Sequence, residues 1–365
     1  MSRVNVVYRV ERNANIRERA TAIAIEQSVE VPLAAITKQP VVDEIVGRVE
    51  HIEDLPDGAH RVTISLAAET ICGETAQLMS MIYGNISLAE DVQILDVDFP
   101  DDLLAAFPGP RFGIEGLRKR MHAHGRPLTC TALKPQGLDS DELADLAYRL
   151  ALGGLDMIKD DHGITDQAYS PFAERVPKIQ AAVARANRET GGHCVYVPSI
   201  AGGPRRLREQ CRIAKEEGVG AIMLIPMIIG LPVFQEMTAE WLDVPVLAHP
   251  GFGGAQRMAP PLFFGKLLRL FGADAVIFVN HLGRFTWPRA TCEATAANLT
   301  GPMRHLKPAL PVPAGGMTLD RVPDMKQSYG DDAMFLIGGG LLTARENLLA
   351  RCREFVEMVK QPVSA

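Results

Sequence analysis

From residue 128 onward, short apolar runs alternate with longer segments in which apolar residues recur at helical spacing. After the first run, Leu143, Leu146, Ala147 and Leu150 fall on one face of such a helix. Eight runs are each read as a strand, at residues 128–133, 155–160, 194–200, 221–227, 245–250, 275–280, 311–316 and 333–340. Continuously apolar strands are buried on both faces, so the pattern predicts a (β/α)8 TIM barrel of the α/β class. An open doubly wound sheet is less favoured because no G-x-G-x-x-G follows the first strand.

The first third of the chain has a different pattern. Residues 3–10 alternate apolar and polar side chains as a half-buried strand does, and residues 15–28 have a helical period. Further on, the pattern predicts a pair of strands, a helix and a last strand, at residues 41–50 with 61–68, at 73–82 and at 91–97. We therefore expect a small α+β, ferredoxin-like domain over residues 1–108, joined through the proline-rich stretch 99–113 to a barrel domain over residues 109–365.

Composition and charge narrow the class of protein. With 365 residues, of which 47% are hydrophobic, the chain is long enough for a large buried core. Its formal net charge is −6 and it has no long basic run, which argues against a nucleic-acid surface and favours small-molecule partners. Its start lacks the continuous apolar region of a signal peptide, and its most apolar stretch, residues 219–234, contains Pro226 and Pro232. We expect a soluble protein without a membrane span.

The cysteines indicate the compartment. The six cysteines are at positions 72, 130, 194, 211, 292 and 352. No two of them form a C-x-x-C pair, and several lie inside apolar segments. This is typical of reduced thiols in a protein core, and it disfavours both a disulfide framework and a structural metal site on cysteine. We therefore expect a cytoplasmic protein.

Polar residues and glycines follow almost every predicted barrel strand. The carboxyl ends of the strands meet at one rim of a TIM barrel, where catalytic groups lie, so these residues are candidates for one site. In chain order they are Lys134, then Lys159 with Asp161 and His162, then Ser199, His249, Asn280 with His281, the pair Gly315 and Gly316, and the run Gly338, Gly339 and Gly340. Glycines after the seventh and eighth strands let backbone N–H groups approach an anion, so we expect a phosphate site there; a pair of tight turns is the alternative.

The stretch LDMIKDDHG, residues 155–163, raises the question of why an apolar strand ends in ionisable side chains. Side chains alternate along a strand, so Lys159 and Asp161 share one side, and His162 follows where the strand ends. A buried lysine beside a carboxylate serves as an ion pair, as a Schiff-base amine or as a general base. If its amine has reacted with CO2, the resulting carbamate and Asp161 form a hard-cation site suited to Mg²⁺. The residues alone leave these alternatives open.

Together the motifs resemble those of the RuBisCO large-chain superfamily, in order and spacing, along nearly the whole chain. GGLDMIKDDHG (153–163) is similar to the segment that carries a carbamylated lysine and two acidic Mg²⁺ ligands. The other similar segments are AIEQSVE (24–30), IYGN (82–85), ALKPQGL (132–138), LLRLFGADAVIF (267–278), VPAGGM (312–317) and FLIGGGLL (335–342). The resemblance implies Mg²⁺ on carbamylated Lys159 with Asp161 and His162, and a Lys134 that handles protons. It also implies a homodimer in which Glu26 and Asn85 reach the substrate of the neighbouring barrel.

Departures from the family pattern argue against carboxylation of ribulose bisphosphate. They fall where RuBisCO binds a second phosphate and handles CO2, and the residues present here are Gln136, Pro250, Ala275, Ile277, Arg284 and Ala314. In addition, His162 replaces the second acidic metal ligand. A neutral imidazole suits softer divalent ions and leaves the site one negative charge short, although we still expect Mg²⁺. The chain thus resembles a RuBisCO-like protein, a branch that keeps the enolising residues and one phosphate site.

The resemblance implies removal of a proton beside the ketone of a phosphorylated sugar, assisted by the metal and by Lys134. The glycines after the last two strands would hold the phosphate, and His249 and His281 are candidates for orienting hydroxyl groups or returning the proton. Within the branch we expect isomerisation of 5-methylthioribulose 1-phosphate in sulfur salvage. The alternatives are enolisation of a diketo-methylthiopentyl phosphate, cleavage of a carboxylated sugar phosphate such as 3-oxo-isoapionate 4-phosphate, a Schiff-base aldolase on Lys159 or Lys134, and a binding module without catalysis.

Overall fold

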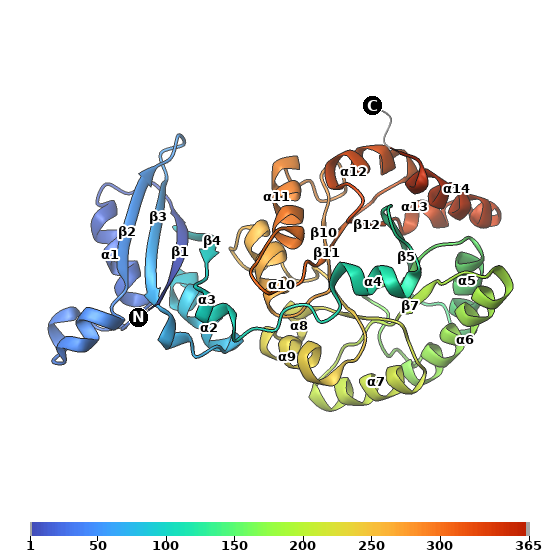
Figure 1. The fold of residues 1–365 in the computed structure, drawn as a ribbon, viewed down its shortest axis with the longest axis horizontal. Coiled ribbons are helices and arrows are strands. Elements are labelled where there is room, and N and C mark those ends of the chain that lie inside the picture. Colours follow the sequence, from blue (N-terminus) through green and yellow to red (C-terminus); the bar gives the residue numbers. More distant parts are fainter. Residues whose placement is uncertain (1, 363–365) are drawn as a thin grey trace. The chain divides into compact units, whose positions relative to one another are not determined.

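A computed structural model describes residues 2–362 and divides the chain into two compact units (Figure 1). The first contains the described residues as far as Pro108 together with Gly253–Phe263, and the second contains Gly109–Phe252 and the residues from Phe264 onward. No helix among residues 2–362 combines the length and the apolar character that a membrane crossing needs. All six cysteines are free, and five of them are buried.

An antiparallel four-stranded sheet with the order β2-β3-β1-β4 forms the first unit. The alternation in residues 3–10 turns Val4, Val6, Tyr8 and Val10 to the interior, where each is fully buried. The strands are β1 (Arg3–Val10), β2 (Arg48–Asp54), β3 (His60–Ala67) and β4 (Val92–Asp98), and the helices are α1 (Ile16–Glu26), α2 (Thr75–Tyr83) and α3 (Asp101–Leu104). The predicted α+β architecture of this part of the chain is confirmed.

The predicted strand over residues 41–50 is wrong in its first half. Val41–Ile45 form a helical turn, and β2 begins only at Arg48. At Gly47 a β carbon would lie 2.4 Å from the backbone oxygen of Ala24 in α1, so only glycine fits where the chain passes this helix just before β2. A short apolar run does not by itself distinguish a strand from a helical turn.

The predicted barrel range, residues 109–365, also needs a correction, because Gly253–Phe263 belongs to the first unit. This segment pairs with the edge strand β4. The Ile94 N–H donates to the Arg257 carbonyl at 3.3 Å, and the Ala259 N–H donates to the Ile94 carbonyl at 2.9 Å. Backbone hydrogen bonds between distant segments place these residues, and no hydrophobic period in the sequence indicates them.

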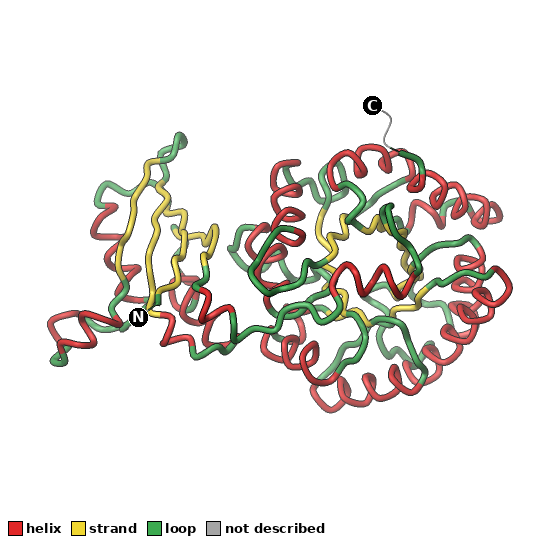
Figure 2. The backbone as a smooth tube through the Cα atoms, in the orientation of Figure 1, coloured by secondary structure: helices red, strands yellow, loops and turns green. Residues whose placement is uncertain are grey.

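Eight parallel strands form the second unit, inside a ring of helices (Figure 2). One half has the order β12-β5-β6-β7 and the other the order β11-β10-β9-β8. A bridge between Ser199 and Met223 joins the halves at β7 and β8, and β11 contacts β12 at the other junction. The strands are β5 (Leu128–Leu133), β6 (Met157–Asp160), β7 (Val195–Val197), β8 (Ile222–Leu224), β9 (Val246–Ala248), β10 (Ala275–Val279), β11 (Leu310–Ala314) and β12 (Met334–Leu336). The predicted TIM barrel is confirmed.

The barrel helices follow the predicted alternation, and some are split into shorter pieces. A capping box of Asp139 and Glu142 starts α5, and Gly230, with φ +92°, separates α8 from α9. The helices are α4 (Gly113–Met121), α5 (Ser140–Leu152), α6 (Phe172–Thr190), α7 (Pro204–Glu216), α8 (Pro226–Ile229), α9 (Leu231–Glu236), α10 (Leu268–Leu270), α11 (Arg289–Thr300), α12 (Val322–Tyr329), α13 (Gly339–Leu342) and α14 (Leu348–Lys360). Of these, α4 closes the amino end of the barrel, where Ile114, Leu117 and Met121 pack with the first residues of the strands.

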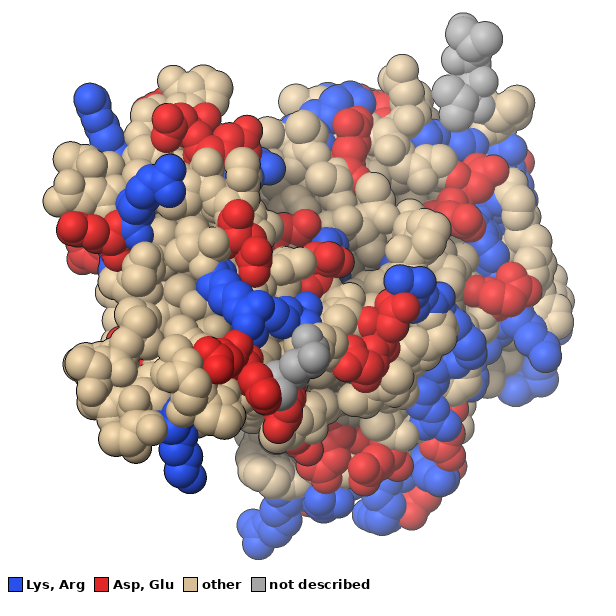
Figure 3. Space-filling model, turned by 60° about the vertical axis from the view of Figure 1, so that its left-hand side comes forward, with Lys and Arg blue, Asp and Glu red and all other residues tan. Residues whose placement is uncertain are grey.

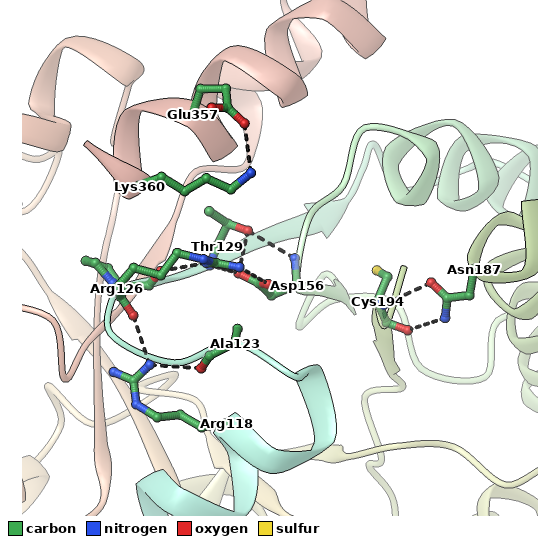
Figure 4. A network of polar contacts seen from close by, with 10 residues as sticks. Arg118, Ala123, Arg126, Thr129, Asp156, Asn187, Cys194, Glu357 and Lys360 are labelled. Carbon is green, nitrogen blue, oxygen red and sulfur yellow. Dashed lines mark hydrogen bonds and ion pairs between the residues drawn. The ribbon is translucent and has the colours of Figure 1, made fainter. Parts of the chain in front are cut away.

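A buried ion pair ties the first two barrel strands together at this amino end (Figure 4). The Arg126 guanidinium donates to both carboxylate oxygens of Asp156, at 2.8 and 2.7 Å. Asp156 is only 6% exposed, and it also accepts from the backbone N–H and the hydroxyl of Thr129, at 2.7 and 2.9 Å. The first aspartate of LDMIKDD therefore has a structural role.

We expect Asp156→Ala to lower the free energy of unfolding by about 3 kcal/mol, because removal of one partner leaves the other charge buried and uncompensated. Urea unfolding followed by circular dichroism measures the change. As a control, Glu354→Ala removes a half-exposed carboxylate that pairs with Arg351 on α14, and it should cost less than about 1 kcal/mol. An equal loss in both variants would contradict the structural role of Asp156.

Charged side chains of both signs are interspersed over the face of the molecule shown in Figure 3. On that face the described residues form no extended block of Lys and Arg of the kind that binds nucleic acid by its charge.

Candidate active site

At the end of β6, Asp160 is turned toward the helix layer. It is fully buried, accepts from the Tyr196 hydroxyl at 3.0 Å and pairs with the Arg175 guanidinium of α6 at 3.2 Å. The backbone N–H of Ser199 donates to the same carboxylate at 3.1 Å. These contacts fix the end of β6 to β7 and α6, and with it the residues on either side of Asp160. Sequence reasoning missed Arg175, because nothing local distinguishes a buried arginine within a helix from a solvent-facing one.

Lys159 is turned away from the helix layer and is 2% exposed. Its amine donates to the backbone oxygen of Asp160 at 3.0 Å. Burial lowers the pKa of this amine, because the charged form loses its hydration. The Lys159 amine is therefore more readily neutral than that of an exposed lysine, and the neutral amine is the form that attacks a carbon electrophile.

Asp161 provides the carboxylate of the site. The Lys134 amine lies 2.6 Å from its Oδ1 atom, and His162 Nδ1 lies 3.5 Å from the same oxygen. Burial acts to raise the pKa of Asp161, but the contacts with His162 and Lys134 and the charge of Lys159 outweigh it, so this pKa lies well below its usual range. Asp161 is therefore ionised at neutral pH.

His162 and His249 bring the ends of β6 and β9 together. Their rings are stacked, with centroids 4.4 Å apart and 16° between the planes. The Gly251 N–H donates to His249 Nδ1 at 3.0 Å, which assigns the proton of the neutral ring to Nε2. Burial, together with the charges of Lys159 and His162, lowers the pKa of His249 to about 2. His249 is therefore a neutral N–H donor at physiological pH.

The glycine turns after β11 and β12 contact each other. Gly315 and Gly316 have φ of +104° and +91°, in the region that favours glycine. At Gly340 a β carbon would lie 2.8 Å from the backbone oxygen of Met317, so the two turns are in contact. At Gly339 no neighbouring atom lies within 4 Å of the corresponding position, so this backbone is open to a ligand.

The side chain of Lys134 links these turns to Asp161. At Gly338 a β carbon would lie 3.7 Å from Cε of Lys134, whose amine is 2.6 Å from the carboxylate. A cavity of about 730 Å³ between α5, α13 and α14 is lined by Lys134 and Gly339, so both are accessible to a small molecule. The structure thus joins Lys134, Asp161 and the glycine turns in one group.

His281 belongs to a different group of contacts. It is 4% exposed, and its Nε2 atom lies 2.8 Å from the Asp324 carboxylate on α12. Asp324 also pairs with Arg289, at the start of α11. No contact described for residues 2–362 joins His281 to Asp161 or its neighbours. Sequence reasoning missed Asp324, which lies in a helical segment and carries no local signal of its partner.

Glu26 and Asn85 lie together in the first unit. The Asn85 amide donates to Glu26 at 3.0 Å and to Glu30 at 2.9 Å, and all three side chains are exposed. Sequence reasoning missed Glu30, which lies in the turn after α1, has a φ of +52° and carries no local signal of its contact with Asn85.

The residues around Lys159 fit a metal ion only if its amine is modified. Within residues 2–362, no group of three or more His, Cys, Asp and Glu side chains is arranged to hold a metal. Asp161 and His162 offer two donor atoms 3.5 Å apart, and a protonated Lys159 offers none. A carbamate on Lys159 would add anionic oxygen, and the lowered pKa of Lys159 favours the neutral amine that takes up CO2. With that change the three residues fit a divalent cation.

Residues 113–283 match the family model described as ribulose bisphosphate carboxylase large chain, catalytic domain. The chain is 50% identical over 359 residues to a Rhodospirillum rubrum protein named 5-methylthioribulose-1-phosphate isomerase, a match that covers 98% of this chain and 96% of that protein. It is 32% identical to a Geobacillus kaustophilus protein named 2,3-diketo-5-methylthiopentyl-1-phosphate enolase, over 93% of this chain and 88% of that protein. A solved Rubisco-like protein from Rhodopseudomonas palustris is 43% identical, with a TM-score of 0.93 over 100% of this chain and 99% of the other.

Proposed function

Because the chain belongs to the RuBisCO large-chain family, we propose that it is a RuBisCO-like enzyme that isomerises a phosphorylated ketose, 5-methylthioribulose 1-phosphate, in methionine salvage. The position of Lys134 carries this proposal. Its amine lies 2.6 Å from Asp161, and its Cε lies 3.7 Å from where a β carbon would stand on Gly338. One side chain able to move a proton thus lies between a turn suited to phosphate and the ionised end of β6.

In the proposed reaction each part of the site has its own task. Backbone N–H groups of the glycine turns, at Gly315, Gly316, Gly338, Gly339 and Gly340, bind the phosphate. The Lys134 amine moves the proton at the carbon next to the ketone, and Asp161 positions this amine. Return of a proton to the former carbonyl carbon, together with transfer of the hydroxyl proton from the neighbouring oxygen to the former carbonyl oxygen, shifts the carbonyl by one position and completes an isomerisation. The neutral His249 donates from Nε2 to a substrate hydroxyl.

Mg²⁺ is the proposed cofactor, held by carbamylated Lys159 with Asp161 and His162. When bound, it would supply positive charge where negative charge develops on the carbonyl oxygen. We also propose a homodimer in which the exposed pair of Glu26 and Asn85 approaches the substrate of the neighbouring subunit.

Enolisation of a diketo-methylthiopentyl phosphate is the second candidate function. The Geobacillus kaustophilus protein that is 32% identical carries the name of such an enolase, whereas the relative at 50% identity carries the name of the isomerase. Both reactions begin with removal of a proton beside a carbonyl group. Incubation with each substrate separately, followed by NMR of the products, distinguishes a shifted carbonyl from an enol.

Deuterium exchange tests the proposal. The protein is incubated in heavy water with 5-methylthioribulose 1-phosphate, with and without Mg²⁺ and bicarbonate. We expect deuterium at the carbon beside the carbonyl, seen as loss of its proton NMR signal, and faster exchange when both additions are present. A Schiff-base aldolase would instead be indifferent to a chelator, and borohydride would trap its substrate on the protein.

The variant Lys159→Ala tests whether Lys159 holds the proposed cofactor. It should abolish the response to Mg²⁺ and bicarbonate, because a methyl group cannot form a carbamate. Lys215→Ala, which removes an exposed lysine paired with Asp243, is the matched control and should respond as the wild type does. The proposal is lost if no deuterium enters the substrate under any condition, or if Lys159→Ala and the wild type behave alike.

A further inference from the structure

The segment of residues 280–287 follows β10 and is named here the β10 loop. It lies against the glycine turn after β11, where the Arg284 N–H donates to the Gly315 carbonyl at 2.7 Å. At Gly316 a β carbon would lie 2.7 Å from Cγ and 3.4 Å from Cδ of Arg284. The aliphatic part of Arg284 therefore occupies the space that a side chain at residue 316 would need.

Further contacts hold the β10 loop in this position. At Gly283 a β carbon would lie 2.5 Å from the backbone oxygen of Gly315, so the two turns approach as closely as backbones allow. At the base of the loop, His281 Nε2 lies 2.8 Å from Asp324. The next residue toward β10, Asn280, is buried and accepts a hydrogen bond from the Tyr329 hydroxyl. The loop is thus fixed to α12 at its start and to the β11 turn at its middle.

The charge of the Arg284 guanidinium is the next feature of the β10 loop. Within residues 2–362, no Asp or Glu pairs with it, and its described contact is with the ring of Phe285, 5.6 Å away. Arg289, five residues further on, pairs with both Asp324 and Glu293. A guanidinium whose stem is packed on a glycine turn, and whose charge is not neutralised, is complementary to an anion held by that turn.

We propose that Arg284 is a phosphate-binding residue of the site, and that the contact between His281 and Asp324 positions the β10 loop that carries it. This inference rests on the proposed function, which assigns a phosphate to the glycine turns. The turns offer uncharged N–H donors, and Arg284 adds a full positive charge and a planar pair of donors that match phosphate oxygens. Asp324 acts through His281, so it is a positioning residue.

Inorganic phosphate is the probe for this inference. Its dissociation constant for the full-length protein is measured by titration calorimetry for the wild type, Arg284→Gln and Arg284→Lys. We expect Arg284→Gln to bind phosphate about 10- to 100-fold more weakly, because a charged hydrogen-bonding group is lost. Arg284→Lys should lie between the two, since it keeps the charge and loses the planar pair of donors. Arg212→Gln, an exposed arginine of α7 paired with Glu216, is the control and should bind as the wild type does.

A double-variant comparison tests the positioning role. Asp324→Ala alone should weaken phosphate binding about 3- to 10-fold, a range typical of indirect coupling. In the Arg284→Gln background the same substitution should have no further effect, because the loop position matters for phosphate only while Arg284 is present. A general loss of structure would instead weaken binding in both backgrounds.

Equal phosphate affinity of the wild type and Arg284→Gln would overturn the inference, and additive losses in the double variant would overturn the positioning role. These experiments distinguish failure of the inference from failure of the proposed function. If phosphate binding depends on Arg284 but no ketose phosphate exchanges deuterium, the inference holds and the proposed function fails. If deuterium exchange occurs and Arg284→Gln leaves KM and phosphate affinity unchanged, the proposed function holds and the inference fails.

Discussion

Lys134→Met is expected to lower the rate of deuterium exchange into 5-methylthioribulose 1-phosphate by about 10²- to 10⁴-fold, the contribution typical of one acid–base group. Methionine keeps most of the length of the side chain and removes the amine that lies 2.6 Å from Asp161. The measurement is the initial rate of loss of the substrate proton signal, at saturating substrate and with Mg²⁺ and bicarbonate present.

Two further variants separate proton transfer from charge. Lys134→Arg keeps the positive charge but not a group that readily gives up its proton, so it should be nearly as slow as Lys134→Met. Lys215→Met removes an exposed lysine paired with Asp243 and should leave the rate unchanged. A rate in Lys134→Met within about threefold of the wild type, well outside the typical loss of an acid–base group, would show that another residue moves the proton.

Arg175→Met is expected to lower the free energy of unfolding by about 3–5 kcal/mol, the usual cost of breaking a fully buried ion pair. The variant leaves the Asp160 carboxylate buried without its cation. It also removes donors to the backbone carbonyls of Ser170 and Thr165, at 2.8 and 2.7 Å, in the stretch between β6 and α6. The midpoint and slope of urea unfolding measure the loss. Activity should fall as well, because Lys159 and Asp161 flank Asp160.

The double variant Arg175→Met with Asp160→Leu shows whether the unpaired charge is the cause. Since it removes both charges, it should be more stable than Arg175→Met alone, although Tyr196 and Ser199 lose an acceptor. Arg212→Met, at an exposed site on α7, should change stability by less than about 0.5 kcal/mol. A double variant less stable than Arg175→Met would show that the hydrogen bonds to Asp160 matter more than its charge.

The parts of the fold that follow from local pattern could be predicted. The apolar run of β5 covers residues 128–133 and ends before Lys134 and Pro135, and the structure has the strand at the same residues. Buried parallel strands need continuous apolar stretches, so their number and order are visible in the sequence. Because side chains alternate along a strand, the sequence also predicts that Lys159 and Asp160 point to opposite sides of β6. In the structure Asp160 is turned toward the helix layer and Lys159 away from it.

Contacts between strands that are distant in the sequence could not be predicted from the residues alone. Two such contacts arise only when the barrel closes: His162 stacks on His249, and Lys134 approaches Gly338. None of these residues carries a local sign of its partner. His281 is a candidate that lies apart from the others. It follows a strand as they do, but its side chain contacts Asp324 on α12. Side-chain direction after a strand ends is set by packing, which a hydrophobic period does not encode.

The chain passes from one compact unit to the other three times: after Pro108, after Phe252 and after Phe263. A protein cut after Pro108 would therefore lose the strand-edge partner of Ile94, and the barrel fragment would retain a segment whose hydrogen bonds belong to the missing unit. An evolutionary exchange of the first unit between relatives would have to replace two separate stretches of sequence together.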